Sequence, residues 1–220
     1  MINSDRPMTQ TNRDNWLPAR SISERQFYLM VLPCERCEGG PFDFASTEQT
    51  PDGQADIWYA RCRTCGTGKR LMFDRSKLLV PDERRDDGLP VVNPSERASE
   101  LLDVGQWLSL FHAIISATAE QSSRKEAQRL GYEATLCLEE ALKFYPNDSE
   151  LPGEEAFFSE PSRRRFREHP EQFARDRLHQ MRQKLPSLRV MRSHLDGSPD
   201  QSSGGGSWWA RLWRRLRGAR

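Results

Sequence analysis

Two pairs of cysteines have the residue type and the spacing of a metal site. Two residues separate Cys34 from Cys37 and Cys62 from Cys65, and 24 residues lie between the pairs. A two-residue spacer lets the chain turn sharply enough to aim both sulfurs of a pair at one point. Four thiolates that meet at one point form a tetrahedral site. We therefore expect these four cysteines to hold one metal ion.

Such a site has a structural role. Four thiolates leave no open coordination position, so the ion neither activates water nor polarises a substrate. It supplies folding free energy to a module of about fifty residues, which is too small to bury a large core alone. The fifth cysteine, Cys137, lies in a helical pattern without a second thiol at ligand spacing. We expect Cys137 to be a buried apolar residue.

Disulfide bonds are the alternative use of the paired cysteines. The first 15 residues are polar and do not resemble a secretory signal peptide. We therefore expect a reducing, cytoplasmic compartment, in which thiols bind metals more often than they form disulfides.

Around the cysteines the sequence is typical of short β-strands. A turn is predicted at residues 51–53, Pro-Asp-Gly, between the two pairs. The β-prone stretches are residues 27–32, 41–44, 56–61 and 69–73. We expect four strands, of which the middle two form a hairpin that joins the cysteine pairs.

The cysteine turns, their glycines and the predicted hairpin together resemble a zinc ribbon over about residues 27–74. Gly39-Gly40 and Gly66 follow the two pairs and supply permissive backbone. The resemblance implies a structural Zn²⁺ bound by the four thiolates. It also implies a link to nucleic acid or transcription, which many zinc ribbons serve. Rubredoxins use the same two turns to hold iron for electron transfer, but this chain lacks the proline and aromatic residues that they pack over the metal.

Charge is distributed unevenly along the chain. The 220 residues carry a net charge of +1, yet residues 163–220 contain 15 basic and 5 acidic side chains. Residues 27–75 contain 6 basic and 7 acidic side chains. Modules that bind nucleic acid usually present a positive surface to the phosphates. Nucleic acid is therefore a second choice of partner, and the basic region Arg163 to Arg192 or the C-terminal tail would carry it. A solvated helix start is the simpler account of the basic cluster Arg163–Arg167 within that region.

After a linker rich in charge and proline, helical periodicity begins. Ser95 has the character of an N-cap, and Ser123 begins a second helix that runs to Tyr145. A last helix is predicted from Pro170. The first helix has its apolar residues on one face, at Leu101, Val104, Leu108, Phe111 and Ile115. The first two helices are expected to form an antiparallel hairpin.

Residues 123–148 resemble the second helix of a tetratricopeptide repeat. The shared marks are Ala134, Ala141 and the terminal Pro146. This resemblance implies binding of another protein, and an ordinary helical hairpin is the alternative. No motif predicts catalysis, because the four histidines are scattered and the chain has no nucleophile, phosphate-loop or dinucleotide motif. We do not expect an enzyme.

The C-terminal segment has the pattern of an amphipathic helix on a tether. A run rich in glycine and serine precedes it, and arginines occupy its opposite face. The residues expected to make contact are Trp208, Trp209, Leu212, Trp213 and Leu216. They suit an anionic membrane surface, such as the inner face of the cell membrane, and they suit a groove on a partner protein equally well.

The sequence therefore predicts an α+β protein with a small N-terminal zinc-ribbon β module, a small helical domain and a tethered amphipathic C-terminal helix. The expected divisions are a flexible arm (1–26), the ribbon (27–75), a linker (76–94), the helical domain (95–192), a Gly/Ser linker (193–206) and the basic tryptophan-rich helix (207–220). The function we expect is that of a zinc-binding adaptor with a protein partner. A ribbon protein associated with nucleic acid is the first alternative, and an iron redox carrier is the second.

Overall fold

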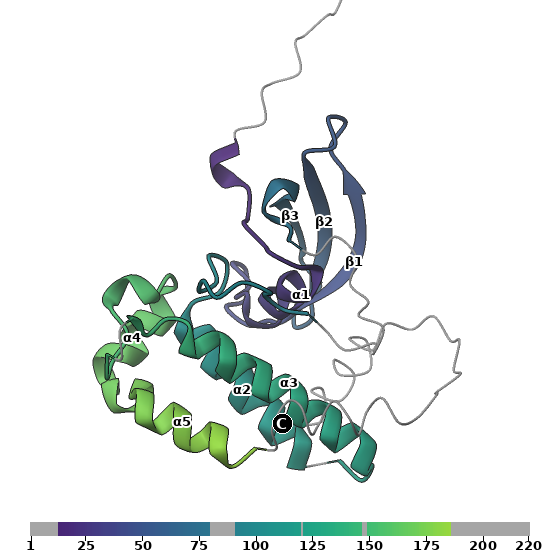
Figure 1. The fold of residues 1–220 in the computed structure, drawn as a ribbon. Coiled ribbons are helices and arrows are strands. Elements are labelled where there is room, and N and C mark those ends of the chain that lie inside the picture. Colours follow the sequence, from purple (N-terminus) through teal and green to yellow (C-terminus); the bar gives the residue numbers. More distant parts are fainter. Residues whose placement is uncertain (1–12, 80–90, 120, 147–148, 186–220) are drawn as a thin grey trace, which may run out of the picture.

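The computed structural model describes residues 13–79, 91–119, 121–146 and 149–185 (Figure 1). The main elements are α1 (Ile22–Val31), β1 (Phe42–Gln49), β2 (Ala55–Cys62), β3 (Gly68–Asp74), α2 (Val104–Ala119), α3 (Arg124–Leu142), α4 (Glu160–Glu168) and α5 (Arg175–Gln183). Short 3-10 turns lie at Arg13–Asn15, Arg75–Lys77, Glu154–Ala156 and Pro170–Phe173. The strands come early and most of the helices come late, which confirms the expected α+β class.

The three strands form an antiparallel sheet in the order β1-β2-β3. The predicted turn between β1 and β2 is present, with Gly53 at a φ of 67° and the Thr50 hydroxyl accepting the Ala55 N–H at 3.0 Å. The register shifts between Phe44 and Ser46, which marks a β-bulge in β1. Leu17 pairs with the outer edge of β3, donating its N–H to the Met72 carbonyl at 2.7 Å.

Residues 27–32 were predicted to form a fourth strand, and that prediction is wrong because residues up to Val31 belong to α1. The helix begins with the capping-box sequence Ser-x-x-Glu at Ser21–Glu24, in which the carboxylate reaches the residue before the N-cap. Ser21 Oγ accepts from the Glu24 N–H at 3.0 Å, and the Glu24 carboxylate accepts from the Arg20 N–H at 2.6 Å. The predicted boundary between residues 26 and 27 therefore falls inside a helix. Residues 13–26, expected to lie in a flexible arm, are part of the fold.

Helix α1 lies between the sheet and the helical hairpin (Figure 1). The Phe27 ring is fully buried and meets Trp107 of α2 edge to face, with 5.7 Å between ring centroids. On the sheet side, the guanidinium of Arg25 lies 4.7 Å from the Phe73 ring centroid and forms an ion pair with Asp56 at 2.7 Å. The ribbon and helical domains predicted as separate units thus share one hydrophobic core.

Helices α2 and α3 form the predicted antiparallel hairpin, but α2 begins at Val104 and not near Ser95. Asp103 caps it, accepting the Gln106 N–H at 2.7 Å, while Gln106 Oε1 accepts the Asp103 N–H at 2.9 Å. Ser95 instead donates to the Asn93 side chain at 2.8 Å. Ser123 caps α3 as predicted.

Asp103 also fixes the start of α4. Its carboxylate accepts hydrogen bonds from the Phe158 N–H, from the N–H and hydroxyl of Ser159, and from the Ser162 hydroxyl, at 2.7 to 3.1 Å. The side chain is fully buried. The predicted last helix is divided into the turn at Pro170–Phe173 and α5. Among the described helices, none has the length and apolar character that crossing a membrane requires.

Candidate metal centre

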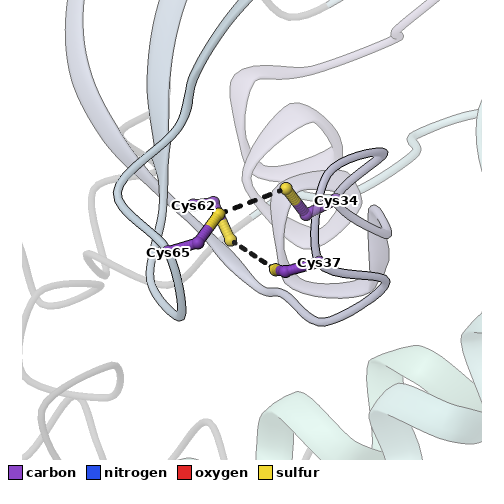
Figure 2. Close-up of side chains that lie close together, drawn as sticks. All are labelled: Cys34, Cys37, Cys62 and Cys65. Carbon is purple, nitrogen blue, oxygen red and sulfur yellow. Dashed lines mark hydrogen bonds between the residues drawn. The ribbon is translucent and has the colours of Figure 1, made fainter.

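The structure brings the sulfurs of Cys34, Cys37, Cys62 and Cys65 within 4.8 Å of one another (Figure 2). Cys34 Sγ lies 3.6 Å from Cys65 Sγ, and Cys37 Sγ lies 3.7 Å from Cys62 Sγ. A tetrahedron with metal–sulfur bonds of about 2.3 Å has edges of about 3.8 Å. The four thiols therefore have the spacing of a single tetrahedral ion. All four are free cysteines, so the disulfide alternative is not supported.

Both cysteine pairs are held by the same backbone turn, which we call a knuckle. In the first knuckle, Cys34 N–H donates to the Gly39 carbonyl at 2.7 Å, and Glu38 N–H donates to the Cys34 carbonyl at 2.8 Å. In the second, the corresponding bonds join Cys62 to Thr67 and to Gly66, both at 2.8 Å. Matching bonds give matching geometry, so each knuckle presents its two sulfurs in the same way.

The residue that follows the second cysteine is left-handed in both knuckles. Gly66 has a φ of 72°, as its type predicts, and Glu38 has a φ of 55° in the first knuckle. A side chain at positive φ is strained by about 1–2 kcal/mol. The sequence pointed to glycine as the permissive residue, and the structure shows that the first knuckle uses a glutamate at that position.

Gly39 and Gly40 instead allow neighbouring parts of the chain to approach closely. A Cβ on Gly40 would lie 2.9 Å from the backbone carbonyl oxygen of Leu32, and a Cβ on Gly39 would lie 3.1 Å from Thr64 Oγ1. Thr64 also donates its hydroxyl to the Gly40 carbonyl at 3.1 Å, which joins the second knuckle to the first. Gly40 therefore lets the first knuckle pack against its own entering chain, and Gly39 leaves room for Thr64 of the second knuckle.

Three elements position the knuckles. The first follows the end of α1, and Cys62 is the last residue of β2, paired with Phe42 of β1. The Arg63 N–H donates to the Pro41 carbonyl at 2.9 Å, and the Arg63 guanidinium forms an ion pair with Asp43 at 2.9 Å. The sheet register thus places the second knuckle beside the chain that leaves the first.

Hydrogen bonds favour the thiolate form of Cys65. The Thr67 hydroxyl lies 3.2 Å from Cys65 Sγ, and hydrogen bonds from the side chain and backbone of Thr67 lower the pKa of this thiol, whereas the pKa of Cys37 in the same cluster is raised. Thiolates, not thiols, bind metal ions. The side chain of Thr67 is a site residue that sequence reasoning missed, and its position two residues after the second cysteine is the only signal that marks it.

The remaining candidate residues lie elsewhere. Cys137 is buried in α3, and burial raises its pKa well above the ordinary value. Within the described residues, no other group of three or more histidine, cysteine or carboxylate side chains gathers at metal-binding distance. Arg163 and Arg167 both pair with Glu160, at 3.8 and 2.8 Å, which offsets part of the basic charge of α4. The tail residues Trp208, Trp209, Leu212, Trp213 and Leu216 lie outside the described residues.

No family model matches the chain, and no similar curated protein or solved structure was found. Neither the zinc-ribbon resemblance nor the tetratricopeptide resemblance therefore gains support from a relative. The case for a metal centre depends on the sulfur geometry alone.

Proposed function

We propose that this chain is a non-enzymatic zinc-binding adaptor in which one structural Zn²⁺ is held by Cys34, Cys37, Cys62 and Cys65. The observation that carries the proposal is the tetrahedral spacing of the four sulfurs, 3.6 and 3.7 Å across the knuckles. When bound, the ion crosslinks the end of α1 to the turn between β2 and β3. A coordination shell filled by four thiolates is suited to holding a fold and not to activating water.

The donor set suits zinc and also accepts iron, since both ions bind four thiolates tetrahedrally. Polar groups next to the sulfurs favour the structural role. Thr64 lies within the second knuckle and Thr67 follows Cys65, and Cys37 and Cys65 are partly exposed. A redox carrier of the rubredoxin kind encloses its iron with apolar and aromatic side chains. The contacts of Thr64 and Thr67 beside the second knuckle are polar instead.

The adaptor role is supported by the way the metal and the helices are joined. Zinc fixes α1, and α1 carries the helical hairpin on its other side through Phe27 and Trp107. The result is a rigid frame that presents helical surfaces to a partner protein. Nucleic acid stays the second choice, because the metal module is not basic and Glu160 pairs with two arginines of the basic cluster.

Metal analysis of protein purified without chelator tests the proposal. We expect one zinc per chain and no visible absorption. Cys37→Ser should reduce the metal content to well below one ion, while the control Cys137→Ser should leave it unchanged. A coloured protein with a thiolate-to-iron absorption band would show that the bound ion is iron and not zinc. A metal-free protein, or loss of metal in Cys137→Ser, would refute the four-cysteine assignment.

A further inference from the structure

A groove of about 640 Å³ runs along α2, away from the cysteine sulfurs. One wall comes from α4. The other comes from the end of α1 and from Pro33 and Pro41, which lie before and after the first knuckle. Its apolar lining includes Met30, Val31, Pro33, Leu110, Ala113 and Ala117. Sites for small molecules typically measure about 300–1,000 Å³ and are mostly apolar. The groove has the size and lining of such a site.

Small side chains on α2 keep the floor of the groove open. Gly105, Ser109, Ala113 and Ala117 recur every fourth residue and therefore share one face of the helix. At one end α4 crosses closely, because a Cβ on Gly105 would lie 2.5 Å from Ser162 Oγ. From Ser109 to Ala117 the floor extends for about 12 Å, given a rise of about 1.5 Å per residue.

A positively charged side chain lies beside this apolar floor. The half-buried Arg165 of α4 donates to two neutral acceptors, Ser109 Oγ at 3.3 Å and Gln172 Oε1 at 3.0 Å. Its guanidinium also lies 5.6 Å from the Phe173 ring centroid. No carboxylate among the described residues bonds to it. The groove therefore contains a partly desolvated positive charge without a counter-ion from the described chain.

The charges around Arg165 strengthen this conclusion. Burial lowers the pKa of Arg165, and the neighbouring positive charge of Arg177 lowers it further. The Asp103 carboxylate, which bonds to the groove residues Ser159 and Ser162, already accepts five hydrogen bonds. An anion bound at Arg165 would be stabilised by both arginines.

We propose that the groove binds an amphiphilic carboxylic acid, with its carboxylate on Arg165 and its apolar chain along Ala113 and Ala117. A floor of about 12 Å accommodates an extended chain of roughly ten carbons, with carbon–carbon bonds of about 1.5 Å. Charge argues against the chain's own C-terminal tail as the occupant. That tail carries Arg211, Arg214 and Arg215 and no acidic side chain within residues 207–220, so its side chains supply no anion for Arg165.

Calorimetric titration of the full-length, metal-loaded protein with dodecanoate, below its micelle concentration, tests the proposal. We expect saturable one-to-one binding, and binding at least tenfold weaker for dodecyltrimethylammonium, which has the same chain and the opposite charge. Arg165→Gln should weaken dodecanoate binding at least tenfold, whereas Arg165→Lys should retain most of it. Ala113→Phe, which fills the floor, should also weaken binding at least tenfold.

Two matched controls separate binding from folding. Arg164→Gln removes a neighbouring exposed arginine from α4, and Ala119→Phe adds a phenyl ring at an exposed position of α2 outside the groove. Both should bind dodecanoate within twofold of the unmodified protein. Circular dichroism melts show whether every variant is folded.

Several results would overturn the proposal. These are absence of saturable binding, binding of many dodecanoate molecules per chain, equal affinity for the cationic amphiphile, or an affinity that Ala113→Phe does not change. A tenfold gain in dodecanoate affinity on replacing Trp209 and Trp213 together by alanine would also overturn it. That gain would show that the tail competes for the groove.

Discussion

Glu133 of α3 is fully buried, and its burial predicts that the stability of this protein depends on pH. Among the described residues, neither of its carboxylate oxygens has a hydrogen-bond partner. Arg129 forms an ion pair with this carboxylate, and the Arg129 Nε lies 3.5 Å from Glu133 Oε1. Burial raises the pKa of Glu133 to about 8, since the attraction of Arg129 offsets only part of the desolvation. The side chain is therefore protonated in the folded protein at neutral pH.

The sign of the effect follows from proton binding. In the unfolded chain the same carboxyl has its ordinary pKa of 4.5. Between that value and about pH 8 the folded state holds one proton more than the unfolded state, so the free energy of unfolding falls as pH rises. Each pKa unit corresponds to about 1.4 kcal/mol, so Glu133 lowers the stability by about 3 kcal/mol at pH 7 and by about 5 kcal/mol well above pH 8.

Glu133→Gln removes this titration and keeps the shape of the side chain. We expect its stability advantage over the unmodified protein to grow by about 3 kcal/mol between pH 5.5 and pH 8.5. Urea unfolding of the metal-loaded proteins, followed by circular dichroism at several pH values, measures the difference. Glu96→Gln, at an exposed position, is the control and should show no such trend. An advantage of Glu133→Gln that is constant with pH, or that shrinks as pH rises, would refute the reasoning.

Four further predictions concern the shared core, the left-handed positions, the hydrogen bonds of Asp103 and the tail. Chelation of the metal should lower the melting temperature of the helical signal together with that of the sheet, because both share a core; helices that melt unchanged would show independent domains. Glu38→Gly should raise the free energy of unfolding by about 1 kcal/mol and Gly66→Ala should lower it by about the same amount, as measured by urea unfolding, because both positions are left-handed. Asp103→Ala should cost about 3 kcal/mol in the same assay, since it removes the cap of α2 and four hydrogen bonds between the buried carboxylate and the segment that begins α4, and a cost below about 1 kcal/mol would contradict that role. Trp213→Ala should abolish either the blue shift of tryptophan emission with anionic vesicles or the capture of one defined partner, and retention of both would remove the tail from the functional surfaces.

Local patterns predicted the four-cysteine cluster well. The two-residue spacers and Gly66 lie within single turns, so nothing distant is needed to form them. The turn at residues 51–53 has equally local causes. Helix α1 was missed because its second half, from Phe27 to Val31, is rich in β-prone residues. The capping-box residues Ser21 and Glu24, which are visible in the sequence, form hydrogen bonds that stabilise the start of the helix.

Contacts between distant residues could not be predicted in the same way. Phe27 and Trp107 meet across 80 positions, and the intervening charged linker suggested a domain boundary. The groove likewise combines α1, α2 and α4, and its arginine belongs to a cluster that the sequence explains adequately as a solvated helix. The small residues recurring every fourth position in α2 were the one visible sign of an open helix face.

The edge strands of the sheet determine whether sheets from several copies of this chain could pair with one another. Leu17 already occupies the edge of β3 near Phe73, and the rest of that edge is short and carries Lys69 and Arg70. Within the described residues, β1 is paired on one side only. Short, charged edges resist pairing. Two copies that joined through β1 would bury the open edge of each and leave only protected edges outside. If copies of this chain associated edge to edge through β1, the pair would be closed and would not extend into a fibre.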